Sequence, residues 1–107
     1  MSRGEIWSVS GGVYASKPRP ALILQSDQFS ETSSITVAPF TTDPTDAPLF
    51  RLPIPADPEN GLRSPCSIMI DKVTTISRNN LGSRIGRLGD DDVVRVNRAV
   101  IVFLGIA

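Results

Sequence analysis

The sequence predicts a single, mainly β domain over residues 1–107, a small β-barrel that ends in an α-helix. Nine prolines and eight glycines interrupt the chain often, which favours short strands joined by turns over long helices. Hydrophobic residues make up 40% of the chain and charged residues 21%, as in globular proteins with one compact core. Helical spacing of apolar residues is clearest near the C-terminus.

The first two strands are expected on either side of a stiff loop. Residues 3–12 predict a strand that a pair of glycines ends. Residues 11–20 predict a loop, in which Pro18 and Pro20 hold their neighbours extended. Residues 19–26 predict the second strand, because their unbroken apolar run indicates burial on both faces.

The middle of the chain predicts two more strands. A polar connection over residues 27–34, with one helical turn, leads to a β-branched, alternating strand over residues 34–42. Pro39 near the end of that strand indicates a sheet edge or a bulge. A turn-rich linker covers residues 43–48, and residues 49–62 predict a short strand followed by a proline-rich loop.

The longest predicted strand covers residues 64–77 and is expected to bend around Asp71 and Lys72. Residues 78–88 then predict a turn and a short strand that runs from residue 84 to residue 88. These strands complete the predicted barrel.

The last segment predicts an α-helix that begins at the acidic run Asp90–Asp92. Acidic residues at a helix start interact favourably with the positive end of the helix dipole and can cap free amides. Apolar residues then recur at helical spacing, with one polar member: Val93, Val96, Asn97, Val100, Ile101 and Leu104. The β-branched content would favour a strand instead. We expect the helix, because three acids have no such role at the start of a strand.

The charge pattern excludes a protein that is drawn to nucleic acid by its overall field, because the net charge is zero. The charges are nevertheless uneven. Residues 31–60 carry one basic residue against five acidic ones, and residues 61–89 carry five basic residues against one acidic residue. A local basic patch is therefore compatible with the sequence.

Missing residue types exclude several kinds of site. The chain has no histidine, which removes Ser-His triads and common zinc sites, and Cys66 is alone, which removes an internal disulfide. We therefore expect no metal and no cofactor. Arg3 and Glu5 break any apolar leader, and the apolar run over residues 99–107 is too short to span a bilayer. These features predict a cytoplasmic protein.

Six motifs, in this order along nearly the whole chain, resemble the MazF/PemK toxin family: RGEIW, KPRPALIL, ITVAPFTT, SIMIDKVTTI, IGRL and a final helix ending in LGIA. The resemblance implies an SH3-like antiparallel β-barrel with a C-terminal helix, the CcdB/MazF-like fold, usually as a homodimer. It also implies the toxin of a type II toxin–antitoxin pair. Such toxins are metal-independent endoribonucleases that cut single-stranded RNA, often mRNA, and a cognate antitoxin blocks their RNA groove.

Three residues match the active-site pattern of this family. The resemblance implies that Arg19 is the catalytic arginine and that Thr41 is the threonine that contacts the transition state. Asp71 falls on the acidic position of the family segment D/E-Q-I-R-T. In that segment this chain has Lys72 and Thr74, where glutamine and arginine are common.

Metal-free RNA cleavage uses the 2′-OH of the RNA as the nucleophile. The enzyme must help to deprotonate that oxygen, stabilise the charge on the phosphorane and protonate the 5′ oxygen. Arg19 suits charge stabilisation because its planar guanidinium stays charged and matches two phosphate oxygens; the resemblance implies that it also donates a proton. Thr41 can donate one hydrogen bond. Asp71 can accept the 2′-OH proton if burial raises its pKa; the alternative is an ion pair with Arg84 or Arg78.

Four further residues are predicted to bind RNA. Lys17 and Lys72 would contact phosphates, Tyr14 would stack on a base, and Thr42 follows the predicted catalytic threonine. Met69 stands where PemK-type members have an arginine that takes part in the reaction.

Two other functions remain open at this point. A CcdB-like gyrase poison would share the fold, lack a nuclease site, and end in a bulky residue followed by Gly-Ile, as residues 104–106 do. The RGEIW and KPRPALIL motifs speak against it. A non-catalytic SH3-like module would need an aromatic groove for proline-rich peptides, and the chain has only six aromatic residues.

Overall fold

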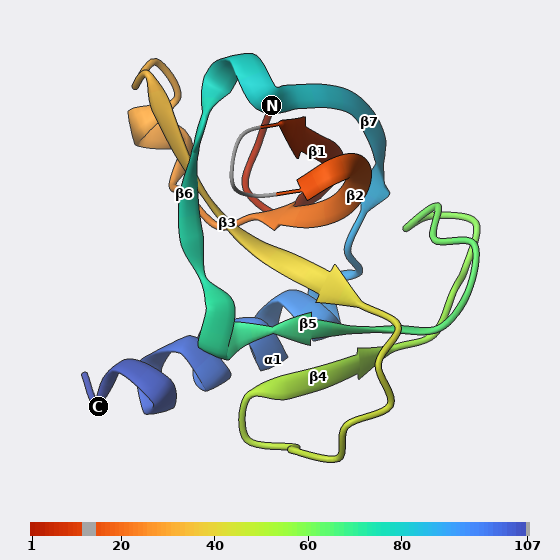
Figure 1. Cartoon of the computed structure of the whole chain (residues 1–107). Helices are drawn as coiled ribbons and strands as arrows, with labels where there is room; N and C mark the ends of the chain where they lie inside the picture. The colour runs from red at the N-terminus through yellow and green to blue at the C-terminus, as the bar shows by residue number, and fades with distance from the viewer. Residues whose placement is uncertain (12–14, 107) are drawn as a thin grey trace.

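The structure, a computed structural model, describes residues 1–11 and 15–106, which contain seven strands and one α-helix (Figure 1). The strands are β1 (Glu5–Gly11), β2 (Ala15–Ile23), β3 (Ser34–Thr41), β4 (Arg51–Ile54), β5 (Cys66–Met69), β6 (Thr74–Ser77) and β7 (Leu81–Arg87). The short 3-10 turns are η1 (Asp27–Phe29), η2 (Ile70–Lys72) and η3 (Arg78–Asn80), and α1 (Asp90–Leu104) follows β7. The predicted mainly β fold with one C-terminal helix is confirmed.

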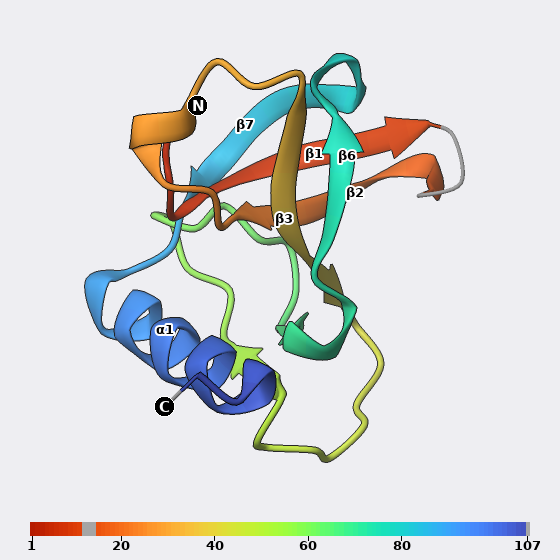
Figure 2. The same ribbon diagram turned by 90° about the vertical axis from the view of Figure 1, so that its left-hand side faces the viewer.

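The sheet is antiparallel throughout and is open in the described part of the chain. Its order is β4-β5-β3-β2-β1-β7, with β6 also paired to β3. The strands at the two ends of this order, β4 and β7, do not pair with each other among the described residues, so hydrogen bonds do not close the sheet into a barrel. Figure 2 shows α1 and β4 at one end of the molecule and the tips of β1 and β2 at the other.

Strand β3 holds the sheet together because it pairs with three other strands. One edge of β3 pairs with β2. The other edge pairs with β6 over residues 34–37, where Val37 lies opposite Thr74, and then with β5, where Phe40 lies opposite Ile68. Pro39 lies between these two ladders, where β3 changes partner. A residue without an amide N–H is tolerated at such an interruption of the hydrogen-bonding pattern.

Strand β2 starts four residues before the predicted start at Arg19, so that Pro18 as well as Pro20 lies inside it, and it ends at Ile23. Residues 15–20 face only β1, since β2 pairs with β3 from Ala21 onwards. The two prolines therefore fall on a stretch with one open edge, which is where a sheet accepts proline. The prediction of a loop over residues 11–20 was wrong for residues 15–20, and Arg19 is held in a strand opposite Val9.

The bend that was predicted around Asp71 and Lys72 is confirmed, and it divides the predicted long strand into two. β5 ends at Met69, η2 contains both bend residues, and β6 continues from Thr74. The last strand, β7, starts at Leu81, three residues before the predicted start, and pairs with β1.

Helix α1 confirms the helix prediction over the strand alternative. Asp90–Asp92 occupy its first turn, although no side chain caps its start. Val96 and Ala99 are buried against the sheet. The predicted apolar stripe is buried only in its first part, because Ile101 is 38% exposed and Leu104 is 61% exposed.

Two clusters of buried apolar side chains form the core. One lies between the sheet and α1 and joins Ile6 and Leu22 to Val96 and Ala99. The other lies under β1, β2, β3 and β6 and contains Val9, Ala21, Ile23, Ile35, Val37 and Ile76. None of the helices in the described residues is long and apolar enough to cross a membrane.

Candidate functional site

Three hollows adjoin each other on the surface between β2, β3, β5 and the β4–β5 connection. The first hollow, of about 420 Å³, is lined by residues that include Arg19, Phe40, Thr41, Met69, Lys72 and Thr74. The second hollow, of about 730 Å³, is lined by residues that include Ser8, Arg19, Thr42, Arg63, Ser64 and Ser83. The third hollow, of about 390 Å³, is lined by residues that include Thr41, Thr42, Asp43, Pro53, Cys66 and Ser67.

The predicted site residues lie where these hollows meet. Arg19 lines the first and second hollows, Thr41 the first and third, and Thr42 the second and third. The three hollows are therefore neighbours on the surface, and together they are called the concave region below. The structure brings Arg19, Thr41 and Lys72 to the same hollow although 53 residues separate the first of them from the last.

Arg19 is exposed and rigidly mounted. Its backbone lies in β2 opposite Val9, and the proline on either side fixes the local φ angles. In the described residues its side chain makes no ion pair and no hydrogen bond. Its guanidinium is therefore available to an anionic ligand in either of the two hollows that it lines.

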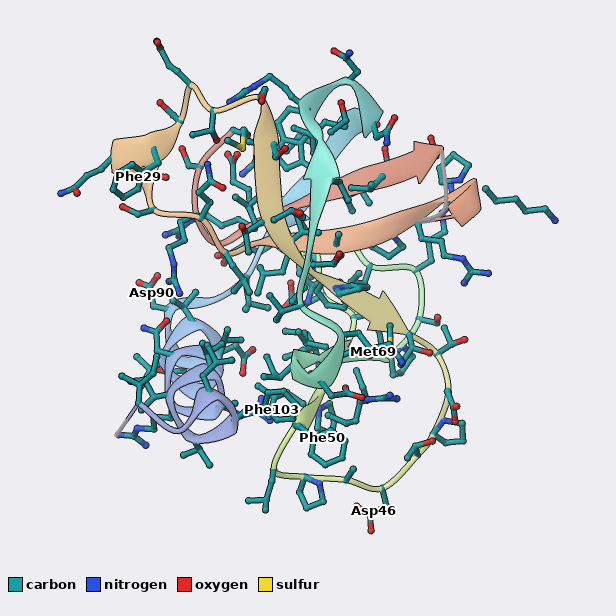
Figure 3. All side chains as sticks on the ribbon, turned by 60° about the vertical axis from the view of Figure 1, so that its left-hand side comes forward. Phe29, Asp46, Phe50, Met69, Asp90 and Phe103 are labelled. Atoms are coloured by element: carbon teal, nitrogen blue, oxygen red, sulfur yellow. The ribbon has the colours of Figure 1, made fainter. Side chains whose placement is uncertain are left out.

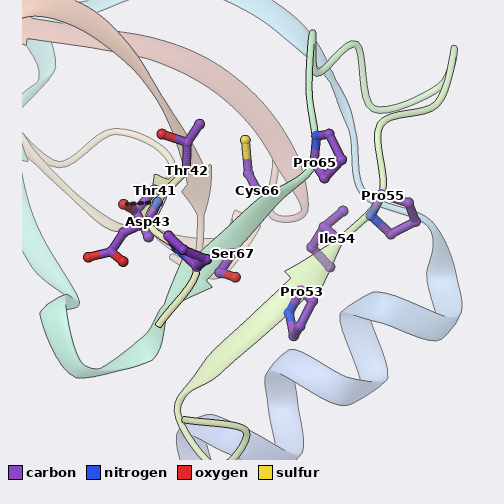
Figure 4. Close-up of a pocket in the computed structure, with 10 residues that line it drawn as sticks. Thr41, Thr42, Asp43, Pro53, Ile54, Pro55, Pro65, Cys66 and Ser67 are labelled. Carbon is purple, nitrogen blue, oxygen red and sulfur yellow. Dashed lines mark hydrogen bonds between the residues drawn. The ribbon is translucent and has the colours of Figure 1, made fainter. Parts of the chain in front are cut away.

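The hydroxyl of Thr41 is oriented by the backbone that follows it. Its Oγ1 accepts a hydrogen bond of 3.1 Å from the amide of Asp43, which Figure 4 shows as a dashed line. The carboxylate of Asp43 in turn accepts two hydrogen bonds from Thr45. Because a hydroxyl has one donor and two acceptor positions, Thr41 keeps its hydrogen free to donate to a ligand.

Asp71 is paired with Arg51, a partner that the sequence analysis did not identify. Arg51 Nε and Nη2 donate to the two carboxylate oxygens at 2.7 and 3.0 Å, and the side chains are only 13% and 21% exposed. The predicted alternatives were wrong, because Arg84 pairs with Glu5 and Arg78 donates to the carbonyls of Ser30 and Thr32.

This ion pair opposes the role predicted for Asp71 as a proton acceptor. That role requires a raised pKa, whereas the hydrogen bonds and charge of Arg51 lower the pKa of Asp71 below its usual value and outweigh burial, which raises it. Asp71 is also not among the residues that line the first hollow. Its carboxylate instead ties η2, and with it Lys72, to the start of β4.

The predicted RNA contacts lie in different places. Lys72 lines the first hollow and Thr42 the second and third. Lys17 is exposed on β2, two residues before Arg19. Tyr14 falls outside the residues that the structure describes. Trp7 packs against the second core cluster, and its ring N–H donates to Glu5 Oε1 at 3.1 Å.

The sequence analysis missed Arg63 and Cys66 as residues of the concave region. Arg63 belongs to the basic segment 61–89, but nothing in the sequence shows that its loop returns to β2. Cys66 lines both the second and third hollows, where burial raises the pKa of its thiol and the S–H donates to the carbonyl of Ser64 at 3.3 Å. A thiol that stays protonated is a poor nucleophile.

The chain as a whole is similar to a known family of proteins. The profile of a family described as PemK-like, MazF-like toxin of type II toxin-antitoxin system matches residues 2–104. A protein named Probable endoribonuclease MazF, from Mycolicibacterium smegmatis, is 54% identical over 108 residues, which cover 100% of this chain and 99% of that protein.

Two solved structures share the fold over almost their whole length. One is an endoribonuclease in complex with its cognate antitoxin from a mycobacterial species, with a TM-score of 0.81, 19% identity and coverage of 100% of this chain and 97% of that one. The other is the Mycobacterium tuberculosis toxin MazF-mt6, with a TM-score of 0.80, 27% identity and coverage of 94% and 96%. Because the family profile spans nearly all of the sequence, this chain belongs to the PemK-like, MazF-like family of type II toxin–antitoxin toxins.

Proposed function

We propose that this protein is the toxin of a type II toxin–antitoxin pair and an endoribonuclease that cleaves single-stranded RNA, including mRNA, without a metal ion. The observation that carries the proposal is that Arg19 and Thr41 line the same hollow, as a guanidinium and a hydroxyl must if both contact one phosphate. The family membership and the name of the relative from M. smegmatis support the reaction class. Neither favours the alternative of a CcdB-like gyrase poison.

In this proposal the scissile phosphate lies in the first hollow. The guanidinium of Arg19 bridges two phosphate oxygens, and the hydroxyl hydrogen of Thr41 donates to the same group. Both interactions strengthen as attack by the 2′ oxygen adds negative charge to the phosphorane, so they lower the barrier. The 2′-OH proton passes to solvent water, the bond between phosphorus and the 5′ oxygen breaks, and that oxygen takes up a proton from solvent. Lys72 adds a positive charge at the rim. Asp71 acts as a positioning residue, because its pairing with Arg51 holds the turn that carries Lys72.

Three further properties belong to the same proposal. Residues 1–107 act as one domain, whose bent sheet corresponds to an SH3-like barrel that hydrogen bonds leave open. The protein acts in the cytoplasm, where mRNA is translated. A cognate antitoxin inhibits it by covering the concave region. A mycobacterial relative of the same fold has been solved with such a partner, which supports this role.

The proposed toxin is a homodimer, and the exposed apolar side chains near α1 supply its interface. Val102 is 62% exposed, Leu104 61% and Leu49 72%. Figure 3 shows Phe103 beside Phe50, with their ring centroids 6.0 Å apart. Light scattering at micromolar concentration should give twice the chain mass of 11.5 kDa, and Val102→Asp should shift the protein towards the monomer. A wild-type protein that stays monomeric would contradict this part of the proposal.

The reaction class can be tested with purified protein and single-stranded RNA in EDTA. Because the proposed site uses only protein side chains, we expect cleavage at the same rate with and without the chelator. The products should carry a 2′,3′-cyclic phosphate and a 5′-OH, and an RNA with 2′-deoxyribose on the 5′ side of the scissile bond should remain intact. Sequencing the new 5′ ends then gives the recognised sequence. Absence of cleavage, together with trapped gyrase–DNA complexes, would favour the gyrase poison instead.

A further inference from the structure

The second hollow lies directly beside the proposed catalytic hollow, and Arg19 lines both. Arg63 is the second arginine that lines this second hollow, and Ser8, Ser64 and Ser83 line it as well. The volume of about 730 Å³ is within the range of small-ligand sites. Two arginines in a concave surface are suited to a phosphate, and the apolar residues that also line this hollow, Leu62 and Ile85 among them, can lie against its sugar.

The loop that carries Arg63 is held in one shape by the buried side chain of Asn60, which is 2% exposed. Asn60 Oδ1 accepts from the amides of Asp57 and Leu62 at 3.1 and 3.0 Å, and Asn60 Nδ2 donates to the carbonyl of Pro55 at 2.9 Å. The amide of Asn60 donates to Asp57 Oδ1 at 2.7 Å. The amide side chain therefore organises the backbone on both sides of itself, and Arg63 follows immediately after the buried Leu62.

The same loop is fixed against β7. The amide of Arg87 donates to the carbonyl of Glu59 at 3.0 Å. The approach is so close at Gly86 that a Cβ there would lie 2.3 Å from the carbonyl oxygen of Asn60. Gly61 has a φ of +69°, a conformation that glycine adopts without strain. Arg63 is therefore presented to the second hollow by a loop that is ordered before any ligand arrives, which lowers the entropy cost of binding.

The charge of Arg63 is available to a ligand. Six of the other arginines are engaged within the protein: Arg51, Arg84, Arg87 and Arg95 in ion pairs, and Arg3 and Arg78 in hydrogen bonds to backbone carbonyls. Arg19 and Arg98 make neither kind of contact in the described residues. Across residues 1–11 and 15–106, Arg63 makes neither kind of contact. Arg63 therefore lies on an ordered loop beside a concave surface and has no ion-pair partner in the described residues. This arrangement is expected of a residue that binds an anion.

We propose that the second hollow binds a phosphate of the RNA adjacent to the scissile one, and that Arg63 is the residue that holds it. The inference rests on the proposed function, because it assumes that the scissile phosphate lies in the first hollow. In a single-stranded RNA whose scissile phosphate contacts Arg19, the next phosphate is one nucleotide away. The second hollow adjoins the first, since Arg19 lines both, and can therefore receive this phosphate. This contact extends the substrate beyond one nucleotide and orients the strand across the catalytic residues.

The test uses RNA oligonucleotides that contain the cleaved sequence, made uncleavable by 2′-deoxyribose at the scissile nucleotide. In separate oligonucleotides a neutral methylphosphonate replaces the phosphate on the 5′ side or the 3′ side of the scissile one. Binding is measured for the wild type, for Arg63→Gln and for Arg87→Gln. The last variant is the control, because it removes an arginine charge from β7 outside the three hollows.

We expect Arg63→Gln to weaken binding of the unmodified RNA on the order of tenfold or more, as the loss of a charged hydrogen bond does. One of the two methylphosphonates should weaken wild-type binding by a similar factor and cause no further loss in Arg63→Gln. The logarithm of the association constant decreases linearly with the logarithm of the salt concentration. The magnitude of this negative slope should decrease by about 0.7 in Arg63→Gln and stay unchanged in Arg87→Gln.

Equal affinity of the wild type and Arg63→Gln for the unmodified RNA would overturn the inference. The inference would also fail if Arg63→Gln weakened binding by the same factor for the unmodified RNA and for both methylphosphonate RNAs. Failure of the proposed function has a different signature, because wild-type protein would then leave the cleavable RNA intact. The binding measurements follow once the cleaved sequence is known, so a negative result with an active wild-type protein counts against the role of Arg63 alone.

Discussion

Arg19→Ala should reduce RNA cleavage on the order of 10²–10³-fold or more, because it removes the guanidinium that stabilises the charge on the phosphorane. The side chain is exposed and has no partner among the described residues, so its loss should leave the melting temperature almost unchanged. Single-turnover kinetics measure the loss of cleavage rate, and thermal unfolding of the same preparation measures the melting temperature. In cells the variant should no longer arrest growth.

Arg19→Lys is the matched control for this prediction. Lysine keeps the positive charge but not the planar pair of donors that a guanidinium offers to two phosphate oxygens. Its activity should therefore fall between those of the wild type and Arg19→Ala, while RNA binding changes little. A folded Arg19→Ala protein that cuts RNA at the wild-type rate would show that the scissile phosphate does not bind beside β2.

Arg51→Met should lower the free energy of unfolding by about 2–3 kcal/mol at neutral pH, because it leaves the mostly buried carboxylate of Asp71 without its partner. Arg51→Met/Asp71→Asn should recover much of this loss, since it removes the unpaired charge. Urea denaturation of the three proteins measures the difference. Cleavage should also weaken in Arg51→Met, because the turn that carries Lys72 is no longer tied to β4.

The same pair predicts the direction of a pH dependence. Arg51 holds the pKa of Asp71 below its usual value, so the unfolded state binds the proton more readily than the native state does. The stabilisation is therefore complete at pH values above the ordinary aspartate pKa of about 4 and is lost as the pH falls through the lowered native pKa. The stability gap between wild type and Arg51→Met should shrink on acidification; a gap that stays constant would contradict the assignment.

The sequence predicted the mainly β fold and the helix because those signals are local. Turn residues separate the strands, and three acids precede an apolar run with helical spacing at residues 90–104. The prediction failed at residues 15–18, which were assigned to a proline-containing loop and not to the strand that follows it. A strand tolerates proline where one of its edges is not paired. The unpaired edge of β2 ends where β3 begins to pair with it, and the local sequence does not show this position.

The candidate site was predicted unevenly for a similar reason. Arg19 and Thr41 were identified through family motifs and Lys72 as a phosphate contact, and the structure brings the three to one hollow. The partner of Asp71 was missed because the register of β4 against β5, with Arg51 opposite Met69, sets that contact across 20 residues of sequence. Arg63 was missed because its position depends on hydrogen bonds made by a buried asparagine within a loop.

The core cluster between the sheet and α1 has a consequence for folding of the protein. It joins Ile6 and Leu22, near the start of the chain, to Val96 and Ala99, near its end. Because these residues are far apart in the sequence, the cluster forms only after a long segment of chain has been closed into a loop. We therefore expect this protein to fold more slowly than a helical bundle of the same size, whose contacts are mostly local.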